Sequence, residues 1–551
     1  MKIALAQLNT HIGNFEKNIS SITDKIKEAK EKNADLVIFP EFSVPGYPPL
    51  DLLEHKSFID HCKQAVIEIA KHCKDIAAIV GSPSLNTGKT GKNLFNTAYF
   101  LSDGQIFAKV NKTLLPTYDI FDEYRYFEPN TNFNVIDFNG KKIALTICED
   151  LWDQQPFEND FGRNRLYNIS PIKKLSLQKP DFIINIAASP FAYSKIKNKR
   201  NIFTSQARKI KIPLIYVNQV GAQTELIFDG GSLVVNSKGE IVERLKYFEE
   251  DFKIIDIERI ETKTPLLINA DNITENIYNA LVMGLSDYFC KMNFKKATLG
   301  LSGGIDSAVS LAIASEALGN KNLRVLLLPS MYSSEHSITD AVTLAENLQV
   351  DYNIIPIEPM FKGFEQSLKP LFRNLTPDIA EENIQARIRG VLLMAVSNKF
   401  GHILLNTSNK SEAAVGYGTL YGDMAGGISL LGDVYKSEVY RLARYINRDE
   451  EIIPENSIAK PPSAELKPNQ KDTDSLPDYE TLDDILFLYI EKQLSADEII
   501  KKGFSKKLVK RIIHLVNINE HKRYQAPPIL RISTKAFGAG RKMPLVARYD
   551  E

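Results

Sequence analysis

Hydrophobic positions in the first half of the chain form short runs, separated by stretches of helical spacing. Apolar runs of this kind predict buried strands, and a period near 3.6 residues predicts amphipathic helices. The segments 232–235 and 241–244 flank Asn236-Ser-Lys-Gly239 and predict an antiparallel hairpin. Residues 1–258 are therefore expected to form a layered α/β domain. Its other strands are expected at 3–8, 36–39, 76–80, 143–147, 182–186 and 214–217, and its helices near 18–32 and 60–73.

The second half follows a different rhythm, in which strands and helices alternate regularly. Residues 259–271 lack periodicity, so we place a linker there and a second domain at 272–551, where Asn272 and Glu275 resemble a helix cap. Regular alternation after a glycine-rich first turn predicts a doubly wound parallel sheet with ligands at the carboxyl ends of its strands. Residues 454–478, rich in Pro, Lys, Asn and Asp, predict a mobile loop. We expect strands at 297–301, 323–328, 352–357 and 402–406, and helices at 306–318, 337–348 and 382–400.

Composition limits the classes of protein that these domains can represent. A chain of 551 residues exceeds one ordinary core, and 44% hydrophobic with 25% charged residues is typical of a soluble globular protein. The 68 basic and 68 acidic residues cancel, which argues against a broad nucleic-acid or membrane surface. The four cysteines show neither metal-ligand spacing nor a disulfide framework, which favours a reducing cytoplasm. The N-terminus reads as a strand and no apolar stretch approaches a membrane span.

The glycine-rich turn between strand 297–301 and helix 306–318 is the strongest chemical signal. Its backbone N–H groups, together with the helix N-terminus, can surround an anion. A carboxylate at Asp306 would repel bound phosphates unless a divalent cation lay between them, so the turn predicts a Mg²⁺-pyrophosphate site. The alternative is an ordinary glycine-rich turn. The residues of the turn are Gly300, Leu301, Ser302, Gly303, Gly304, Ile305, Asp306 and Ser307.

Three residues of the first half have the chemistry of an amide hydrolase. Cys148 ends strand 143–147, where α/β folds expose reactive side chains, and could act as a nucleophile if a base or a cation offsets the acidic residues after it. Glu41 follows another apolar strand and could be the base, while Lys112 could hold the oxyanion of a tetrahedral intermediate. The alternatives are a buried structural cysteine and solvated charges.

The segments around these residues resemble the signature blocks of the nitrilase, or carbon–nitrogen hydrolase, superfamily. The blocks are Ile38-Phe-Pro-Glu41, Lys112-Thr-Leu-Leu-Pro116 and Thr146-Ile-Cys-Glu-Asp-Leu-Trp152. The resemblance implies a four-layer αββα sandwich in which Glu41, Lys112 and Cys148 are base, oxyanion-stabilising lysine and nucleophile, with Glu123 a second acid. It also implies that Tyr118, Ser189 and Lys195 bind glutamine, although Lys197 and Lys199 remain alternatives to Lys195.

The second half resembles the N-type ATP pyrophosphatases, and more closely the glutamine-dependent NAD⁺ synthetases. The blocks that carry this likeness include Glu382-Asn-Ile-Gln-Ala-Arg387, Asn406-Thr-Ser-Asn-Lys-Ser-Glu412, Tyr435-Lys436, Pro462-Ser-Ala-Glu-Leu466 and His521-Lys-Arg523. The resemblance implies an adenine nucleotide α-hydrolase-like domain in which Asp306 and Glu412 bind Mg²⁺. Its implied ATP contacts are the glycine-rich turn, Thr407, Lys436 and Ser463, and its implied dinucleotide contacts are Asn383, Glu412, Asp423 and Lys522. Without the resemblance, Lys436, Arg387 and Arg389 could be solvated.

Together the two resemblances imply one ligase. Ammonia released from L-glutamine by Cys148 would amidate deamido-NAD⁺ to NAD⁺, after ATP has adenylated the nicotinate carboxylate. Because free ammonia protonates in bulk water, a shielded channel is expected, and the family implies a homo-oligomer. The alternatives are another acceptor such as nicotinate mononucleotide, a catalytically silent nucleotide-binding scaffold, and two separate enzymes merely fused.

Overall fold

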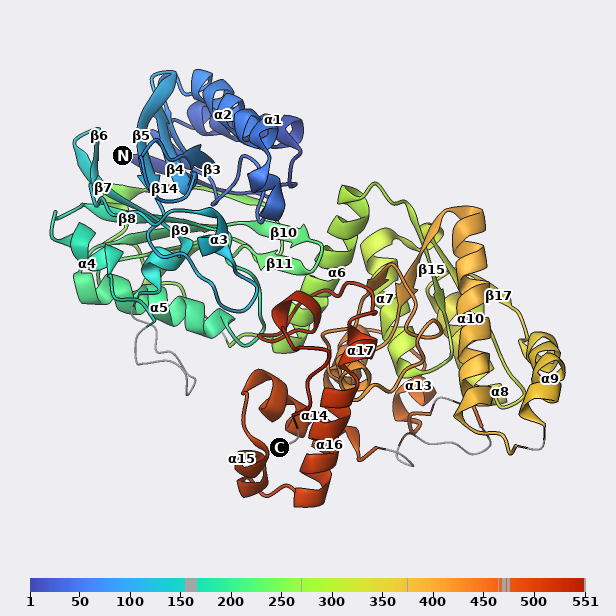
Figure 1. Ribbon diagram of the computed structural model, residues 1–551. Helices are drawn as coiled ribbons and strands as arrows, with labels where there is room; N and C mark the ends of the chain where they lie inside the picture. The colour runs from blue at the N-terminus through green and yellow to red at the C-terminus, as the bar shows by residue number, and fades with distance from the viewer. Residues whose placement is uncertain are drawn as a thin grey trace. The chain divides into compact units, whose positions relative to one another are not determined.

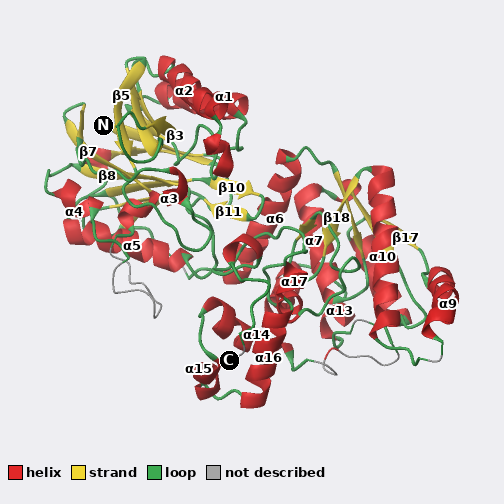
Figure 2. Ribbon diagram, in the orientation of Figure 1, coloured by secondary structure: helices red, strands yellow, loops and turns green. Residues whose placement is uncertain are grey.

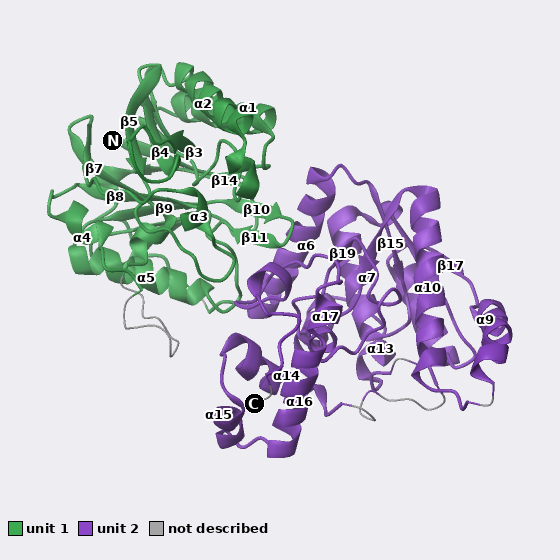
Figure 3. Cartoon of the chain, viewed as in Figure 1, with its two compact units in different colours: residues 1–271 green, residues 272–551 purple. Residues whose placement is uncertain are grey.

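The computed structural model describes residues 1–153, 166–268, 270–373, 375–463, 465–467, 472 and 476–549. The chain divides into two compact units, Met1–Asp271 (unit 1) and Asn272–Glu551 (unit 2), coloured separately in Figure 3. Each unit has its own sheets and its own hydrophobic clusters. Among the described helices, none has the length and apolar character needed to cross a bilayer.

Two six-stranded sheets form the centre of unit 1 (Figure 1). In the first sheet, β1, β2 and β3 run parallel, and the remaining strands pair antiparallel. Its order is β14 (Asp251–Asp256), β1 (Lys2–Gln7), β2 (Leu36–Ile38), β3 (Ala77–Leu85), β4 (Leu94–Ser102), β5 (Gln105–Asn111). In the second sheet, β7, β8 and β9 are parallel. Its order is β13 (Ile241–Arg244), β12 (Leu233–Val235), β9 (Leu214–Asn218), β8 (Phe182–Ala187), β7 (Lys141–Ile147), β6 (Ile136–Phe138).

Alternate residues of β1 show how the layers of unit 1 pack. Ile3 and Leu5 join a cluster with residues of β7, β8 and β9, whereas Ala4 and Ala6 join a cluster with helices α1 (Phe15–Glu31) and α2 (Lys56–Lys71). Helices α4 (Pro171–Ser176) and α5 (Ile196–Ile210) cover the second sheet. The predicted four-layer αββα sandwich is therefore confirmed, as are the predicted strands and the hairpin β12–β13.

Some elements of unit 1 lie outside the segments that the sequence predicted. The exposed strand β5 alternates partly buried and exposed residues, and β10 (Val220–Gln223) pairs only with β11 (Leu226–Asp229) in a two-stranded ribbon. The short helices α3 (Glu123–Tyr126), η1 (Leu50–Glu54), η2 (Cys148–Leu151) and η3 (Ile257–Arg259) complete the unit. Two of these, α3 and η2, carry residues of the candidate site.

A five-stranded, fully parallel sheet organises unit 2, which confirms the predicted doubly wound fold. Its order is β17 (Asp351–Ile354), β16 (Leu323–Leu327), β15 (Lys296–Gly300), β18 (His402–Asn406), β19 (Ile428–Ser429). Helices α7 (Ile305–Leu318) and α10 (Ile379–Phe400) lie on opposite sides of β15 (Figure 1). Because the order of strands reverses at β15, with β16 and β17 on one side and β18 and β19 on the other, the carboxyl ends of β15 and β18 flank a natural binding position.

Further helices surround this sheet and extend beyond it (Figure 2). Residues of α11, α14, η6, α15 and α16 share one hydrophobic cluster. The predicted loop 454–478 was partly wrong, because α13 forms inside it, and part of that segment lies outside the described residues. These helices are α6 (Ile273–Lys291), η4 (Asn320–Asn322), α8 (Glu335–Asn347), α9 (Glu358–Phe372), α11 (Lys410–Val415), α12 (Lys436–Ile446), α13 (Glu455–Ala459), α14 (Tyr479–Leu486), the π-helix η6 (Phe487–Glu491), α15 (Ala496–Lys501), α16 (Lys506–Ile518), α17 (Glu520–Arg523) and η7 (Gly538–Gly540).

Candidate active sites in the two units

Cys148 lies at a sharp turn where the buried strand β7 ends and η2 begins. Its φ angle is +42°, in the left-handed region that a residue with a Cβ seldom adopts. Such local strain is held only where the surroundings fix it, and it occurs often at functional positions. The thiol is 5% exposed, so a small substrate entering the site would meet a nearly dry sulfur.

The Lys112 ammonium joins two acidic side chains in the same buried site. Its Nζ lies 2.9 Å from Glu41 Oε1 and 2.8 Å from Glu123 Oε2. Asn96 Nδ2 donates to Glu41 Oε1 at 2.7 Å, and Tyr47 Oη donates to Glu123 Oε1 at 2.8 Å. The structure thus brings together Glu41 and Lys112 from distant parts of the sequence and adds Glu123 as a third charged member.

The electrostatics of this cluster follow from burial and charge. Burial raises the pKa of the Cys148 thiol, the Glu41 carboxylate adds to that rise, and Lys112 opposes it. Burial also raises the pKa of Glu123 despite the neighbouring Lys112. Burial alone would lower the pKa of Lys112, but the Glu123 and Glu41 carboxylates raise it instead. Lys112 is therefore a fixed cation, and the resting sulfur is a thiol that needs a base.

Asp150 fastens the nucleophile turn to the loop that follows Lys112. Its Oδ1 accepts from the N–H groups of Thr113 at 3.0 Å and Leu114 at 2.9 Å, and its Oδ2 accepts from Ile147 N–H at 3.2 Å. Burial raises the pKa of Asp150 to about 7, although these N–H donors oppose the rise. One carboxyl group therefore sets the relative position of Cys148 and Lys112.

Glu149 receives hydrogen bonds from two tyrosines beside the nucleophile. Tyr118 Oη donates to Glu149 Oε1 at 2.8 Å and Tyr167 Oη at 2.9 Å. Burial raises the pKa of Glu149, and the charge of Lys195 is among the influences that oppose that rise. Tyr118 and Lys195, both predicted to bind glutamine, therefore lie near the same buried carboxyl group.

The three lysines that the sequence left open for glutamine binding lie in different surroundings. Lys199 is 6% exposed and its Nζ lies 2.9 Å from Asp229 Oδ1, so it is committed to a buried ion pair. Lys197 is exposed on α5. Lys195 is partly buried and influences Glu149. The surroundings therefore favour Lys195 for glutamine binding, because it influences Glu149, the residue next to Cys148.

The glycine-rich turn of unit 2 links β15 to α7, and hydrogen bonds within the loop shape it. Ser302 Oγ and Ser307 Oγ lie 3.1 Å apart, and Ser307 Oγ donates to Gly304 O at 2.9 Å. Gly303 has a φ of +78°, and a Cβ there would lie 2.1 Å from Ser337 O, so only glycine fits. The turn is therefore held in one shape before any ligand arrives.

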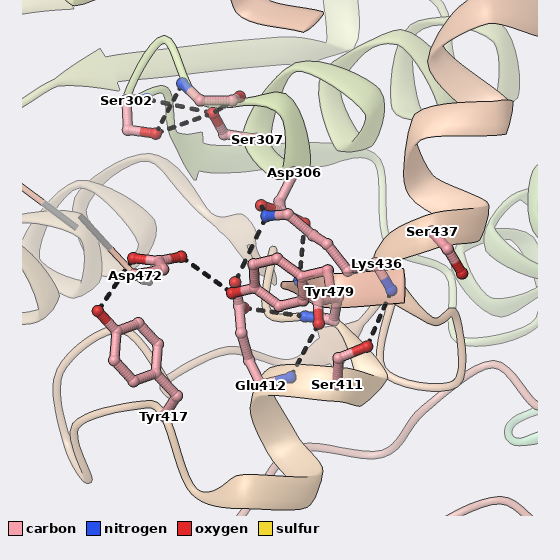
Figure 4. A network of polar contacts seen from close by, with 12 residues as sticks. Ser302, Asp306, Ser307, Ser411, Glu412, Tyr417, Lys436, Ser437, Asp472 and Tyr479 are labelled. Carbon is pink, nitrogen blue, oxygen red and sulfur yellow. Dashed lines mark hydrogen bonds and ion pairs between the residues drawn. The ribbon is translucent and has the colours of Figure 1, made fainter. Parts of the chain in front are cut away.

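Lys436 and Asp306 are the centre of the polar network shown in Figure 4. The Lys436 ammonium donates to Asp306 Oδ2 and lies 3.6 Å from Glu412 Oε1. Asn409 Nδ2 donates to Asp306 Oδ1 at 2.8 Å. Burial raises the pKa of Glu412 and the Asp306 carboxylate adds to the rise, which shows that the two acids face each other. Lys436 is only 2% exposed, so it is no ordinary surface lysine.

Asp472 connects the loop before α14 to this network. Tyr417 Oη donates to Asp472 Oδ1 at 3.0 Å, and Tyr479 Oη donates to Oδ2 at 2.9 Å. The Lys436 Nζ lies 5.2 Å from the centroid of the Tyr479 ring, within cation–π range. These aromatic contacts could not be predicted from the sequence, because they depend on how α11, α12 and α14 pack.

A cavity of about 320 Å³ opens above the carboxyl ends of β15, β16 and β18, a size that suits a nucleotide. Most residues predicted for ATP line it, namely Gly300, Leu301, Ser302, Gly304, Ile305, Asp306, Ser307, Thr407, Lys436 and Ser463, as do Glu412 and Asp423. Gly303 is not among the lining residues, because its backbone turns toward Ser337. Arg389 also lines the cavity, whereas Arg387 is exposed.

The residues predicted to bind the dinucleotide gather around the segment 416–424. Asp423 Oδ1 accepts from Thr419 N–H at 2.6 Å, and Asn383 Oδ1 accepts from Thr419 Oγ1 at 2.7 Å. Lys522 Nζ donates to Gly416 O at 2.7 Å and to Gly418 O at 2.9 Å. Asn383 and Lys522 do not line the nucleotide cavity, but Asp423 does, so the segment borders it.

Asp306 and Glu412 offer two carboxylate groups, which are part of the oxygen donor set that Mg²⁺ prefers. Asp306 and Glu412 both approach the Lys436 ammonium, and their mutual repulsion raises the pKa of Glu412, which a divalent cation would relieve. Oxygen donors from one or two carboxylates, completed by phosphate oxygens, are the usual Mg²⁺ ligands. In the described ranges no three acidic, histidine or cysteine side chains form a metal-binding group, so phosphate oxygens would have to complete the site.

Fold and sites together define a two-domain amidotransferase, a nitrilase-type amide hydrolase joined to an adenylating ATP pyrophosphatase. The carbon–nitrogen hydrolase family matches residues 2–155 and the NAD synthase family matches residues 277–526. The chain belongs to the glutamine-dependent NAD(+) synthetases. It is 45% identical over 554 residues to the synthetase of Synechocystis sp., covering 99% of each chain, and 40% identical over 588 residues to that of Thermotoga maritima, covering 100% of this chain and 99% of that protein.

A solved structure shows the same relation in three dimensions. The glutamine-dependent NAD⁺ synthetase of Acinetobacter baumannii, in complex with adenosine diphosphate, is 39% identical with a TM-score of 0.78. The alignment covers 99% of this chain and 98% of that chain. Both units of this chain therefore match the solved synthetase over nearly their whole length.

Proposed function

We propose that this protein amidates deamido-NAD⁺ to NAD⁺ with nitrogen taken from L-glutamine, at the expense of ATP. The observation that carries the proposal is the presence, in one chain, of a buried thiol with Lys112 and Glu41 and of a nucleotide cavity with convergent carboxylates. The first set is suited to break an amide bond and the second to activate a carboxylate. Family membership supports joining the two chemistries in one reaction.

Glutamine hydrolysis follows from the protonation states in unit 1. Because burial keeps Cys148 as a thiol, Glu41 takes its proton as sulfur attacks the carboxamide carbon of glutamine. The Lys112 ammonium stabilises the oxyanion of the tetrahedral intermediate. Glu41 then returns the proton to the leaving ammonia, and a thioester remains on Cys148. Water, deprotonated by Glu41, attacks the thioester and releases glutamate.

Adenylation follows from the polar groups of unit 2. The nicotinate carboxylate of deamido-NAD⁺ would attack the α-phosphorus of ATP, so that a carboxyl–AMP bond forms as the bond to pyrophosphate breaks. The N–H groups of the 300–307 turn and the Lys436 ammonium are suited to hold the phosphates. Asp306 and Glu412 would hold Mg²⁺, whose positive charge neutralises pyrophosphate as it leaves. Ammonia then displaces AMP, and the loss of a proton gives the NAD⁺ carboxamide.

Ammonia has to travel as the neutral molecule, because the ammonium ion is no nucleophile. We therefore propose a shielded route for ammonia and, as in the expectations from the family, a homo-oligomeric assembly in the cytoplasm. Nicotinate mononucleotide as the acceptor is not favoured, since the full-length relatives are NAD(+) synthetases. The test is to supply ATP, Mg²⁺ and glutamine with each acceptor in turn and to follow AMP, pyrophosphate and the amidated product. If deamido-NAD⁺ gives no NAD⁺, the proposal is wrong.

A further inference from the structure

Lys199 and Asp229 form a buried ion pair behind Ser189, one of the residues predicted to bind glutamine. Lys199 Nζ donates to Asp229 Oδ1 at 2.9 Å and to the main-chain oxygen of Ser189 at 3.3 Å. Lys199 is 6% exposed and Asp229 is 2% exposed. Such a pair loses hydration on both charges, so it is poor evidence for a gain in stability.

Asn218 closes this network from the other side. Its Oδ1 accepts from Ser189 N–H at 2.9 Å, and its Nδ2 lies 3.4 Å from Ser189 O and 3.2 Å from Asp229 Oδ1. Asn218 therefore bonds both the N–H and the carbonyl oxygen of Ser189, Lys199 bonds the carbonyl oxygen, and Asp229 accepts from both of these side chains. The network consequently fixes the backbone of Ser189 and, with it, the position of the Ser189 side chain.

The segment held in this way also reaches the catalytic base. Ala188 N–H donates to Glu41 Oε2 at 3.0 Å, and Phe191 N–H donates to Ile227 O at 2.7 Å in β11, the strand that ends at Asp229. A shift of residues 188–189 would thus displace a glutamine contact and a hydrogen bond to Glu41 together. Errors of about 1 Å in such positions are costly to catalysis.

We propose that Lys199 is a positioning residue for glutamine, acting through Ser189, and that it does not contact the substrate itself. The proposal rests on the glutamine-dependent function above. The ammonium group ties the Ser189 carbonyl to Asp229, and Asn218 completes the anchor. Lys199 therefore acts on the use of glutamine and leaves the amidation reaction in unit 2 untouched.

The test compares the two nitrogen sources in the full-length protein. The variants are Lys199→Met, Lys199→Arg, and Lys199→Met combined with Asp229→Asn, which removes both charges together. Lys173→Met, an exposed lysine on α4, is the control. KM and kcat for glutamine and for ammonium are measured with saturating ATP, Mg²⁺ and deamido-NAD⁺.

We expect Lys199→Met to raise the KM for glutamine about ten-fold or more, with a smaller fall in kcat and unchanged kinetics with ammonium, because only the anchor of Ser189 is lost. Lys199→Arg should bring the KM for glutamine back toward the wild-type value, since a guanidinium can reach both the Asp229 carboxylate and the Ser189 carbonyl oxygen. If Lys199→Met fails to fold, the proposal is tested with the double variant, which lacks both charges. A glutamine KM within about two-fold of wild type, or loss of ammonium-dependent synthesis in the double variant, overturns the proposal. A wild-type protein that makes NAD⁺ from neither source would instead contradict the proposed function.

Discussion

The Lys436 ammonium donates a hydrogen bond to the Asp306 carboxylate, across 130 positions of sequence. Asp306 lies at the start of α7 and Lys436 at the start of α12, so the contact depends on two helix N-termini meeting beside the phosphate turn. Glu412 approaches the same ammonium from α11. The Lys436 cation balances the two carboxylates, and in the proposed reaction it would be available to the phosphates of ATP.

Asp306→Asn should abolish synthesis of NAD⁺ with glutamine and with ammonium alike. The change removes a negative charge from the carboxylate pair that is suited to Mg²⁺, and it leaves Lys436 with one partner fewer. We expect a fall in kcat of about a hundred-fold or more with either nitrogen source. Steady-state release of AMP and pyrophosphate measures the effect. Asp484→Asn, an exposed change on α14, is the control and should behave as wild type.

Cys148→Ala should abolish the use of glutamine and leave the use of ammonium intact, unlike Asp306→Asn, which should abolish both. Glutamine hydrolysis requires the thiolate, so its rate should fall by about a thousand-fold or more, whereas ammonium-dependent synthesis should persist. Assays of glutamate release and of NAD⁺ formation with high ammonium check both statements. Cys290→Ala, at an exposed free cysteine, serves as the matched control. Loss of both activities in Cys148→Ala would contradict the separation of the sites.

Asp150 gives unit 1 a specific dependence on pH. Its pKa is about 7 in the folded protein against an ordinary value of 3.8, so the folded state holds a proton that the unfolded state releases. Its contribution to stability is therefore present below the ordinary pKa and is lost as the pH rises through about 7. The side chain of Asp150→Asn cannot titrate, so the stability of this variant should not fall in the same way as the pH rises. The substitution should also destabilise unit 1 by about 1–3 kcal/mol, because the amide nitrogen faces Ile147 N–H.

The single tryptophan of the chain, Trp152, reports this effect. Its ring lies 6.2 Å from that of Phe203 and two residues from Asp150, so its fluorescence follows the unfolding of unit 1. Urea titrations near pH 5 and pH 8 give the free energy of unfolding of unit 1. The difference in this free energy between wild type and Asp150→Asn should be larger at the lower pH. An equal difference at the two pH values would show that Asp150 does not titrate as described.

Gly303→Ala should damage the phosphate turn without touching unit 1. The φ of +78° and the Ser337 carbonyl oxygen, 2.1 Å from the position of a Cβ, leave no room for the methyl group. We expect the KM for ATP to rise about ten-fold or more, while glutamine hydrolysis by unit 1 keeps its intrinsic chemistry. Gly363→Ala is the control, since a Cβ there meets nothing within 4 Å. An ATP KM unchanged in Gly303→Ala would argue against the turn as the phosphate site.

The sequence could predict features that depend on local pattern. The apolar run before Cys148 and the alternation after Gly304 defined β7 and the doubly wound sheet, because burial imposes periodicity on each element separately. Contacts between distant segments leave no periodic pattern in the sequence, so they could not be predicted in this way. Asn96 and Tyr47 reach Glu41 and Glu123 from 55 and 76 positions away, and only the packed sheets place them there. Lys112 was a candidate from its chemistry, whereas Lys436 was singled out by resemblance, and the roles of both lysines stay predictions.

The loop 454–478 shows why composition can mislead. Its many Pro, Lys, Asn and Asp residues favour irregular structure, yet α13 forms at Glu455–Ala459, where Ser457 Oγ donates to Gly303 O at 3.1 Å. Tertiary contact with the phosphate turn thus outweighs a weak local preference. Lys199 is a similar case: it was an alternative to Lys195 because the segment around them is rich in lysine, and its burial makes it a partner of Asp229.

The central claim is that one nitrogen atom passes from glutamine to the nicotinate carboxyl group within this protein. The most direct measurement supplies glutamine labelled with heavy nitrogen in its side-chain amide, together with unlabelled ammonium, ATP, Mg²⁺ and deamido-NAD⁺. The product is analysed by mass spectrometry, and glutamate, AMP and pyrophosphate are quantified. The account predicts NAD⁺ carrying the heavy label in its carboxamide, with AMP and pyrophosphate formed in equal amounts and glutamate formed with the labelled product. Product that carries only nitrogen from the medium, or ADP and phosphate in place of AMP and pyrophosphate, would contradict it.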